Sequence, residues 1–378
     1  MNIRAAVAKQ LLHRIAPRVD VKVVLPNGEV LGPDKAGLPT LKILNENFFN
    51  RLGNDLKIGL GESFMAGEWV AEPDLGDVLT PYAERLLNIV PGWMRKFRKI
   101  FEPFQPKHEE NNPEGSKSNI SRHYDLSNEL FTLFLDETMT YSSANFAQDD
   151  HTFENLAKAQ IRKIEGILDF AGVKAGMHIL EIGTGWGGFA VYAAQRYGCR
   201  VTTTTISSEQ HEHAQQLFSR AGDAGSRIRL LLEDYRNLKG SYNKLVSIEM
   251  FEAVGLEYYD AFFSSCDRLL TDDGSLVMQT ITMNEHRFGE YRKQSDWIQR
   301  RIFPGSQLAS VREILSSLVR STRLSLFHME DIGMHYAHTL AEWRHRFLDS
   351  IDEVRAKGFD KSFCRMWDYY LAYCEVGF

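Results

Sequence analysis

A glycine-rich turn carries the clearest binding chemistry in the sequence. Residues 179–188 read ILEIGTGWGG, a short apolar run followed by closely spaced glycines. Glycines at Gly183, Gly185 and Gly187 let the backbone approach a ligand closely, and a helix that starts after them presents free N–H groups and the positive end of its dipole. The segment predicts a buried strand, a ligand-binding turn and a helix; a tight turn without a ligand is the structural alternative.

Two kinds of nucleotide cofactor are compatible with these glycines. Gly183, Gly185 and Gly188 fit the GxGxxG spacing of dinucleotide dehydrogenases. Those enzymes hold the ribose with an acidic residue roughly 20 residues further on. The next predicted strand instead ends in TTTTI at residues 202–206, which disfavours a dehydrogenase. The ExGxGxG spacing that starts at Glu181 resembles motif I of class I methyltransferases, whose turn meets the methionine and ribose parts of the cofactor.

Alternating strands and helices must position this turn. Amphipathic helical patterns separate the early members of a series of strand-like segments. The segments are HILEIG (178–183), RVTTTTI (200–206), RIRLLLE (227–233), KLVSIEM (244–250) and SLVMQTITM (275–283). This order predicts an α/β fold with a doubly wound, Rossmann-like parallel sheet that binds ligands at the carboxyl ends of its strands. The helical, aromatic-rich residues from about 285 to 378 are expected to form a lid.

The chain of 378 residues is too long for one ordinary core, so two domains are expected. Residues 1–105 combine a basic start, the strand-like VDVKVVLPNGEVL with its Asn-Gly turn, and a helical pattern from residue 81 to 90. They predict a smaller α+β domain. Residues 106–120 are polar and predict a linker, and residues 121–378 are assigned to the sheet domain with its helical lid.

Composition excludes several other classes. The net charge of −6 argues against a nucleic-acid partner. The four cysteines lack CxxC spacing, so neither a metal site nor a disulfide framework is expected, and a reducing cytoplasm fits. The N-terminus lacks the pattern of a signal peptide, and no uncharged apolar run approaches the roughly 20 residues that span a bilayer. Membrane contact is expected to be peripheral.

Four further segments make the resemblance specific. They are HYDLSN (123–128) with FLD (134–136) and TYSS (140–143), TISSEQ (205–210), DYR (234–236) with SIEMFE (247–252), and YAHTLAEW (336–343). These segments follow the order and spacing of the cyclopropane fatty acid and mycolic acid cyclopropane synthases. Over most of residues 120–378 the chain resembles this family, which implies a Rossmann-like class I methyltransferase domain.

The resemblance implies S-adenosylmethionine as the cofactor. Its contacts would come from Tyr141, Ser142, Glu181, Gly183, Gly185, Gly187, Thr205, Ile206, Gln210, Tyr235 and Arg236. In TISSEQ, Gln210 would replace the usual ribose-binding acid. Structural alternatives remain for three positions: Tyr141 as a core residue, the Thr205 hydroxyl as a strand end, and Tyr235 with Arg236 as an ordinary loop pair.

The implied reaction sets chemical requirements. An alkene is a weak nucleophile, so it must lie in line with the sulfonium methyl group, away from water. The resulting carbocation needs electron-rich faces nearby. Tyr124, Phe251 and Tyr336 are candidates, with core packing as the alternative for each. Ring closure then needs a base to remove a proton from the transferred methyl group.

In the resembling family this base is a bicarbonate ion held by Cys, Glu, His, Tyr and an Ile backbone group. The matching positions here are Ser143, Glu252, Gln279, Tyr336 and Ile281. Ser and Gln keep the hydrogen-bonding ability of Cys and His, but Gln cannot carry the positive charge of His. Bicarbonate is therefore left open. A branched product is the alternative to a ring, with Glu252 or another base removing a different proton.

A basic aromatic segment favours a membrane substrate. Residues 93–104 alternate aromatic with basic side chains, as in a helix that docks on anionic lipid; a solvated interdomain helix is the alternative. The resemblance to phospholipid enzymes with an N-terminal domain implies a homodimer at the cytoplasmic face of the membrane. The expected activity is a cyclopropane-fatty-acyl-phospholipid synthase acting on unsaturated acyl chains. Alternatives are a methyl- or methylene-branching C-methyltransferase, another acceptor class such as a sphingolipid or alkaloid, and a non-catalytic membrane-binding homologue.

Overall fold

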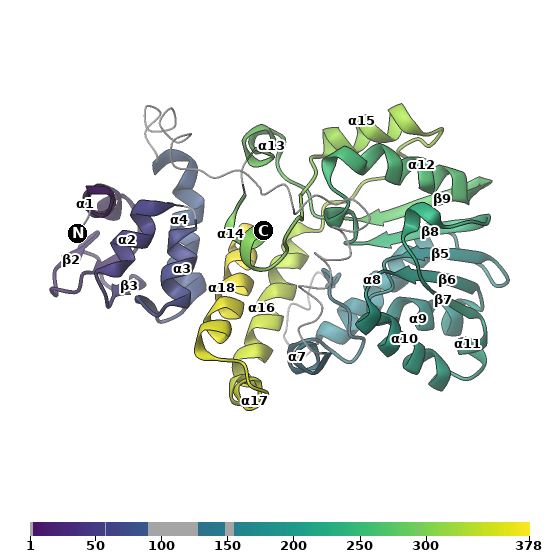
Figure 1. Ribbon diagram of the computed structural model, residues 1–378, viewed down its shortest axis with the longest axis horizontal. Coiled ribbons are helices and arrows are strands. Elements are labelled where there is room, and N and C mark those ends of the chain that lie inside the picture. The colour runs from purple at the N-terminus through teal and green to yellow at the C-terminus, as the bar shows by residue number, and fades with distance from the viewer. Residues whose placement is uncertain (1–2, 57, 90–127, 148–154, 294) are drawn as a thin grey trace. The chain divides into compact units, whose positions relative to one another are not determined.

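The computed structural model divides the chain into two compact units (Figure 1). It describes residues 3–56, 58–89, 128–147, 155–293 and 295–378. Unit 1 comprises residues 1–104, 295–298 and 336–378, and unit 2 comprises residues 105–294 and 299–335. The docking segment 93–104, the linker 106–120 and Tyr124 fall outside the described residues, so the expectations about them stay predictions.

Unit 2 contains the predicted parallel sheet. Its strands are β5 (His178–Ile182), β6 (Arg200–Thr205), β7 (Ile228–Leu232), β8 (Tyr242–Ile248) and β9 (Leu270–Gln279). Their order is β7-β6-β5-β8-β9, and every neighbouring pair is parallel. The α/β class and the order of strand and helix predicted from the sequence are confirmed. Because the strands are parallel, the turns that follow them gather at one edge of the sheet.

Helices cover both faces of this sheet (Figure 1). On one face, α8 (Leu156–Phe170), α9 (Gly188–Tyr197) and α10 (Ser208–Arg220) pack against Ile179 and Val246. On the other, α12 (Tyr259–Leu269) and α15 (Val311–Ser321) pack against Leu180 and Leu245. Successive strand residues point to opposite faces, so adjacent positions such as Ile179 and Leu180 serve different cores.

Unit 2 also contains shorter elements. They are α7 (Asn128–Phe134), α11 (Asp223–Ser226), η5 (Tyr235–Asn237), η6 (Phe251–Ala253), η7 (Leu256–Tyr258) and α13 (Glu285–Tyr291). The short helices η5 and η6 follow β7 and β8, where the sheet ends and a ligand site is expected. Across the described part of the chain, no helix is both long enough and apolar enough to cross a bilayer.

Unit 1 contains a second, smaller sheet. Its strands are β1 (Lys22–Val24), β2 (Val30–Leu31), β3 (Thr40–Ile43) and β4 (Trp69–Glu72), in the order β2-β1-β3-β4. The helices α1 (Ile3–Ile15), α2 (Asn47–Asn54), α3 (Gly59–Met65) and α4 (Leu75–Ile89) belong to the same unit. The predicted Asn-Gly turn joins β1 to β2, and Gly28 there adopts a left-handed φ of +86°. Glycine accepts this conformation without a steric penalty.

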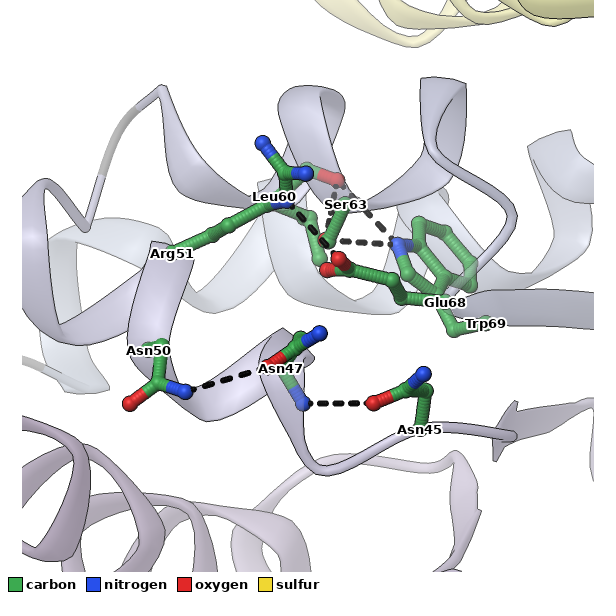
Figure 2. A network of polar contacts seen from close by, with 8 residues as sticks. All are labelled: Asn45, Asn47, Asn50, Arg51, Leu60, Ser63, Glu68 and Trp69. Atoms are coloured by element: carbon green, nitrogen blue, oxygen red, sulfur yellow. Dashed lines mark hydrogen bonds and ion pairs between the residues drawn. The ribbon is translucent and has the colours of Figure 1, made fainter. Parts of the chain in front are cut away.

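A polar network ties the helices of unit 1 to β4 (Figure 2). The indole nitrogen of the fully buried Trp69 donates to the carbonyl of Leu60 and to the hydroxyl of Ser63, both at 3.1 Å. Arg51 on α2 donates to the buried Glu68 at 2.9 Å. These contacts satisfy polar groups that would be costly to bury alone.

The C-terminal helices also belong largely to unit 1. They are α16 (Gly333–Asp349), α17 (Ile351–Ala356) and α18 (Lys361–Gly377). Arg344 on α16 donates to both carboxylate oxygens of Asp74 at 2.8 Å and to Asp368 on α18 at 2.7 Å. The ion pair with Asp74 and the contact of Tyr369 with Phe64 join residues 336–378 to the N-terminal part of unit 1. The expected domain of residues 121–378 stays a prediction.

Candidate active site

The glycine turn between β5 and α9 has the backbone that its sequence predicts. Gly183, Gly185 and Gly187 have φ values of +105°, +52° and +96°, a region that side chains disfavour. The backbone N–H groups of Gly183 and Thr184 both donate to the carbonyl of Thr204 at 3.0 Å. The turn is thus anchored to β6, and the N-terminus of α9 follows directly after it.

Buried hydrogen bonds between β5, β6 and the turn stabilise the turn. The Thr203 hydroxyl donates to Glu181 at 2.5 Å, and the hydroxyls of Thr203 and Thr184 lie 2.7 Å apart. Burial raises the pKa of Glu181 to about 8. The observed contacts of Glu181 are with the protein, so its predicted contact with the cofactor stays a prediction.

The end of β6 orients Gln210. The Thr205 hydroxyl donates to the side-chain oxygen of Gln210 at 2.8 Å, and Ser207 caps α10 by accepting from the Gln210 backbone N–H at 3.2 Å. Ile206 lies between these residues and is half-buried. With its oxygen held by Thr205, Gln210 can direct its side-chain nitrogen towards a ligand hydroxyl.

The pair after β7 makes mainly internal contacts. The ring of Tyr235 is buried and packs edge-on against Phe262, with the ring centroids 5.4 Å apart. Arg236 forms an ion pair with Asp234 at 2.7 Å. Burial opposes ionisation of Asp234, but the hydrogen bonds from Arg236 outweigh it and lower the Asp234 pKa. These contacts lie within the protein, so the predicted contacts of Tyr235 and Arg236 with the cofactor stay predictions.

Aromatic rings cluster beside the glycine turn. The ring of Tyr141 lies 5.3 Å from that of Phe131 and 6.4 Å from those of Trp186 and Phe303. Trp186 is part of the turn itself, and its indole nitrogen donates to Asn128 at 2.7 Å. The sequence singled out Tyr141 but not Trp186, although Trp186 stands between two of the glycines. Such faces can stabilise a sulfonium cation.

Helix α8 holds the segment that follows Tyr141. Lys163 donates to the hydroxyl of Ser142 at 2.6 Å, and Gln160 donates to the carbonyl of Ser142 at 2.9 Å. Ser142 is itself buried. The serine predicted to contact the cofactor is therefore bonded through both its hydroxyl and its carbonyl to α8.

A protein carboxylate lies between the residues expected to hold an anion. The backbone N–H of Ser143 and the side-chain nitrogen of Gln279 both donate to Oε1 of Glu249 at 2.8 Å. Gln279 also donates to the carbonyl of Ser143 at 3.2 Å. The sequence did not single out Glu249 as a site residue, although an acid directly after a parallel strand is a recognisable signal.

Glu252 lies in the next turn of chain. Its Oε1 accepts from the backbone N–H of Ile281 at 2.5 Å and from the Thr280 hydroxyl at 3.0 Å. Its Oε2 is buried and has no hydrogen-bond partner among the described residues. Burial, together with the negative charge of Glu249, raises the pKa of Glu252 to about 7. Because Ile281 bonds to Glu252, β9 ends at Gln279 instead of continuing to residue 283 as the sequence predicted.

Four of the five residues that match the family's anion site meet in unit 2: Ser143, Glu252, Gln279 and Ile281. The fifth, Tyr336, belongs to unit 1, where its ring packs on Phe378 with the centroids 4.6 Å apart.

The aromatic candidate Phe251 is fully buried and packs against Tyr259 and Phe262. For Phe251 the structure thus supports core packing, the alternative to stabilising a carbocation.

Known proteins match the chain along most of its length. A family model described as mycolic acid cyclopropane synthetase matches residues 111–378. Tuberculostearic acid methyltransferase UfaA1 of Mycobacterium tuberculosis is 41% identical over 379 residues, covering 99% of this chain and 88% of the relative. Cyclopropane-fatty-acyl-phospholipid synthase of Escherichia coli K12 is 34% identical over 346 residues, covering 89% and 84%.

Solved structures agree with these sequence matches. The structure of mycolic acid cyclopropane synthase CmaA1 complexed with SAH and CTAB superposes with a TM-score of 0.62 at 32% identity, covering 72% of this chain and 93% of that one. The glycine turn, Gln210 and the Tyr141 cluster fit the same class of cofactor. The protein is an S-adenosylmethionine-dependent methyltransferase of a lipid-modifying family. From the family model and both relatives, the chain belongs to the mycolic acid cyclopropane synthetase family.

Proposed function

We propose that the protein methylates a double bond of an unsaturated fatty acyl chain in membrane phospholipid, and that it releases a methyl- or methylene-branched unsaturated chain. The observation that carries this proposal is the position of Glu249. Its Oε1 accepts hydrogen bonds at 2.8 Å from Ser143 and from Gln279, two of the positions that the resemblance assigns to an anion site. A carboxylate of the chain itself can therefore act as the base.

Cofactor and acyl chain must be held together before methyl transfer. S-adenosylmethionine supplies an electrophilic methyl group. The glycine turn offers backbone N–H groups at the start of α9, and Gln210 offers a side-chain amide to a ribose hydroxyl. The rings of Tyr141 and Trp186 stand beside that turn and exclude water from the sulfonium.

Of the two carboxylates, Glu249 and Glu252, only one is suited to accept the proton. Once the new C–C bond has formed, a carbocation remains on the acyl chain and a proton must leave. Glu252 holds its own proton up to about neutral pH, because burial and the nearby charge of Glu249 raise its pKa to about 7. Glu249 has two N–H donors that favour its ionised form, so it is the carboxylate suited to accept the proton.

The residues present do not fit bicarbonate. An external anion would compete with Glu249 for the donors on Ser143 and Gln279, and it would be repelled by that carboxylate. Gln279 also supplies no positive charge to attract it. A base held at a fixed position can take a proton from the acyl chain, which gives a methyl-branched alkene. After a hydride shift from the methylated carbon to the cation, it can instead take a proton from the transferred methyl group, which gives a methylene branch. We propose these outcomes in place of ring closure. The name of the relative UfaA1, a tuberculostearic acid methyltransferase, supports the same choice.

Lipid analysis tests the proposal. The protein is expressed in a host that makes unsaturated phospholipids, and the acyl chains are analysed by mass spectrometry before and after mild hydrogenation. A branched unsaturated product gains the mass of one methylene group and then takes up hydrogen, whereas a cyclopropane gains the same mass and does not.

A ring product would overturn the branching proposal, and unchanged acyl chains would overturn the choice of substrate. Expression of the Glu249→Gln variant at the same level provides the control for the host's own enzymes.

A further inference from the structure

A buried lysine that the proposed reaction does not use lies close to the proposed base. Lys163 on α8 is 3% exposed, and its ammonium group donates to the hydroxyl of Ser142 at 2.6 Å. Burying an ammonium group is costly unless negative charge compensates for it. Glu249 and Asp136 are the acids whose charges act on Lys163.

The contacts of Lys163 lead to Glu249 through Ser142 and Ser143. Lys163 fixes the Ser142 side chain, while Gln160, one turn earlier on α8, fixes the Ser142 carbonyl at 2.9 Å. The next residue, Ser143, donates its backbone N–H to Glu249 at 2.8 Å. The helix thus holds the segment that delivers a hydrogen bond to the base.

The other acids nearby are poor partners for this ammonium group. Burial raises the pKa of Asp136, although Thr138 opposes the effect with hydrogen bonds, and one Asp136 oxygen is buried with no partner among the described residues. Burial and the charge of Glu249 raise the pKa of Glu252 to about 7. Among Glu249, Glu252 and Asp136, Glu249 is therefore the acid best placed to balance Lys163.

We infer that Lys163 is a positioning residue for Glu249: its charge keeps that carboxylate ionised, and its hydrogen bond to Ser142 aligns the Ser143 N–H with it. The inference rests on the proposed role of Glu249 as the base. In the proposed reaction, Lys163 touches neither the reacting carbons nor the transferred methyl group. Its effect on the reaction comes through the charge and position of Glu249.

Direct titration of Glu249 tests the inference without turnover. Infrared spectra of the full-length protein follow the carboxylate band that disappears in Glu249→Gln. Lys163→Gln keeps a donor for Ser142 but removes the charge, so Glu249 should titrate at least about one pH unit higher. The acid limb of the pH–rate profile should move in the same direction, with a roughly tenfold lower rate on that limb.

Three further variants make the comparison specific. Lys158 is exposed on the same helix, and Lys158→Gln should leave the Glu249 midpoint unchanged. Lys163→Arg retains the charge and should keep the midpoint close to that of the wild type. If Lys163→Gln does not fold, as judged by thermal unfolding, Ser142→Ala removes the hydrogen bond while keeping the lysine, and a small upward shift is expected.

The outcomes separate the two proposals. The inference about Lys163 is overturned if folded Lys163→Gln leaves the titration midpoint of Glu249 unchanged. If Lys163→Gln does not fold, an unchanged midpoint in Ser142→Ala overturns it instead. Neither result depends on which product the enzyme makes. A cyclopropane product from the wild type, or full activity of Glu249→Gln, overturns the role of Glu249 as the base. An upward midpoint shift together with a branched product supports both.

Discussion

Gln279 and Glu249 are joined twice across neighbouring strands. The side-chain nitrogen of Gln279 donates to Oε1 of Glu249 at 2.8 Å, and the backbone N–H of Glu249 donates to the carbonyl of Gln279 at the same distance. The pairing of β8 with β9 sets Ile248 opposite Gln279, so Glu249 is the first residue beyond the paired region. The parallel sheet therefore fixes the proposed base within reach of its donor.

Replacing Glu249 by Gly should give an enzyme that small anions can rescue. Glu249 has a left-handed φ of +48°, which Gly adopts without strain, so the backbone of this turn should be retained. The variant leaves Ser143 and Gln279 without their acceptor, and turnover should fall roughly a hundredfold or more. Added formate or bicarbonate should restore part of it, measured as the rate of methyl transfer against anion concentration.

Two comparisons sharpen this rescue experiment. Glu249→Gln fills the same space with a neutral amide, so anions should not rescue it. Glu257 is exposed in η7, and Glu257→Gln should retain wild-type turnover. Full activity of Glu249→Gly without added anion would show that this carboxylate is not the base.

Replacing Gln210 by Ala should weaken cofactor binding without unfolding unit 2. The change removes the amide that Thr205 orients, and one hydrogen bond of this kind contributes about 0.5–1.5 kcal/mol, or roughly twofold to tenfold in affinity. Calorimetric titration with S-adenosylmethionine measures the loss. Gln216→Ala, at an exposed position of the same helix α10, is the matched control. Equal affinities in the two variants would contradict the role of Gln210.

Replacing Gly183 by Val should distort the turn. The residue has a φ of +105°, and an added Cβ would lie 3.2 Å from the Cβ of Met250. Backbone strain of this kind costs about 1–3 kcal/mol, and cofactor affinity should drop with it. Thermal unfolding with and without S-adenosylmethionine reports both effects. As a contrast, Gly166→Ala on α8 meets no atom within 4 Å and should stabilise the helix by up to about 1 kcal/mol.

Replacing Glu252 by Gln should flatten the pH dependence of stability. Burial and the charge of Glu249 raise the pKa of Glu252 from 4.5 to about 7 in the folded protein. Between these values the folded state keeps a proton that the unfolded chain has lost. The free energy of unfolding of the wild type should therefore fall by about 3 kcal/mol as the pH rises through this range. Denaturant unfolding at several pH values across this range compares the two proteins. If the free energy of unfolding changes equally with pH in both, Glu252 does not keep its proton in the folded protein.

The fold and the backbone of the glycine turn could be predicted from the sequence. Strand alternation, the spacing of Gly183, Gly185 and Gly187, and the TISSEQ segment are local patterns. The glycines follow β5, and TISSEQ begins at the last residue of β6. Local patterns are readable because backbone sterics and side-chain periodicity act over a few residues. The resemblance implied Thr205 and Gln210 as separate cofactor contacts, and the structure shows that their side chains bond to each other.

The base half depended on the tertiary structure. Ser143 and Gln279 are 136 positions apart, and their shared acceptor Glu249 became evident only when β8 and β9 lay side by side. The sequence analysis did not single out Lys163, which packing buries beside Ser142. Sequence gives residue types and local periodicity, whereas burial and charge pairing arise from contacts between distant segments. Those long-range contacts determine which carboxylate can serve as the base.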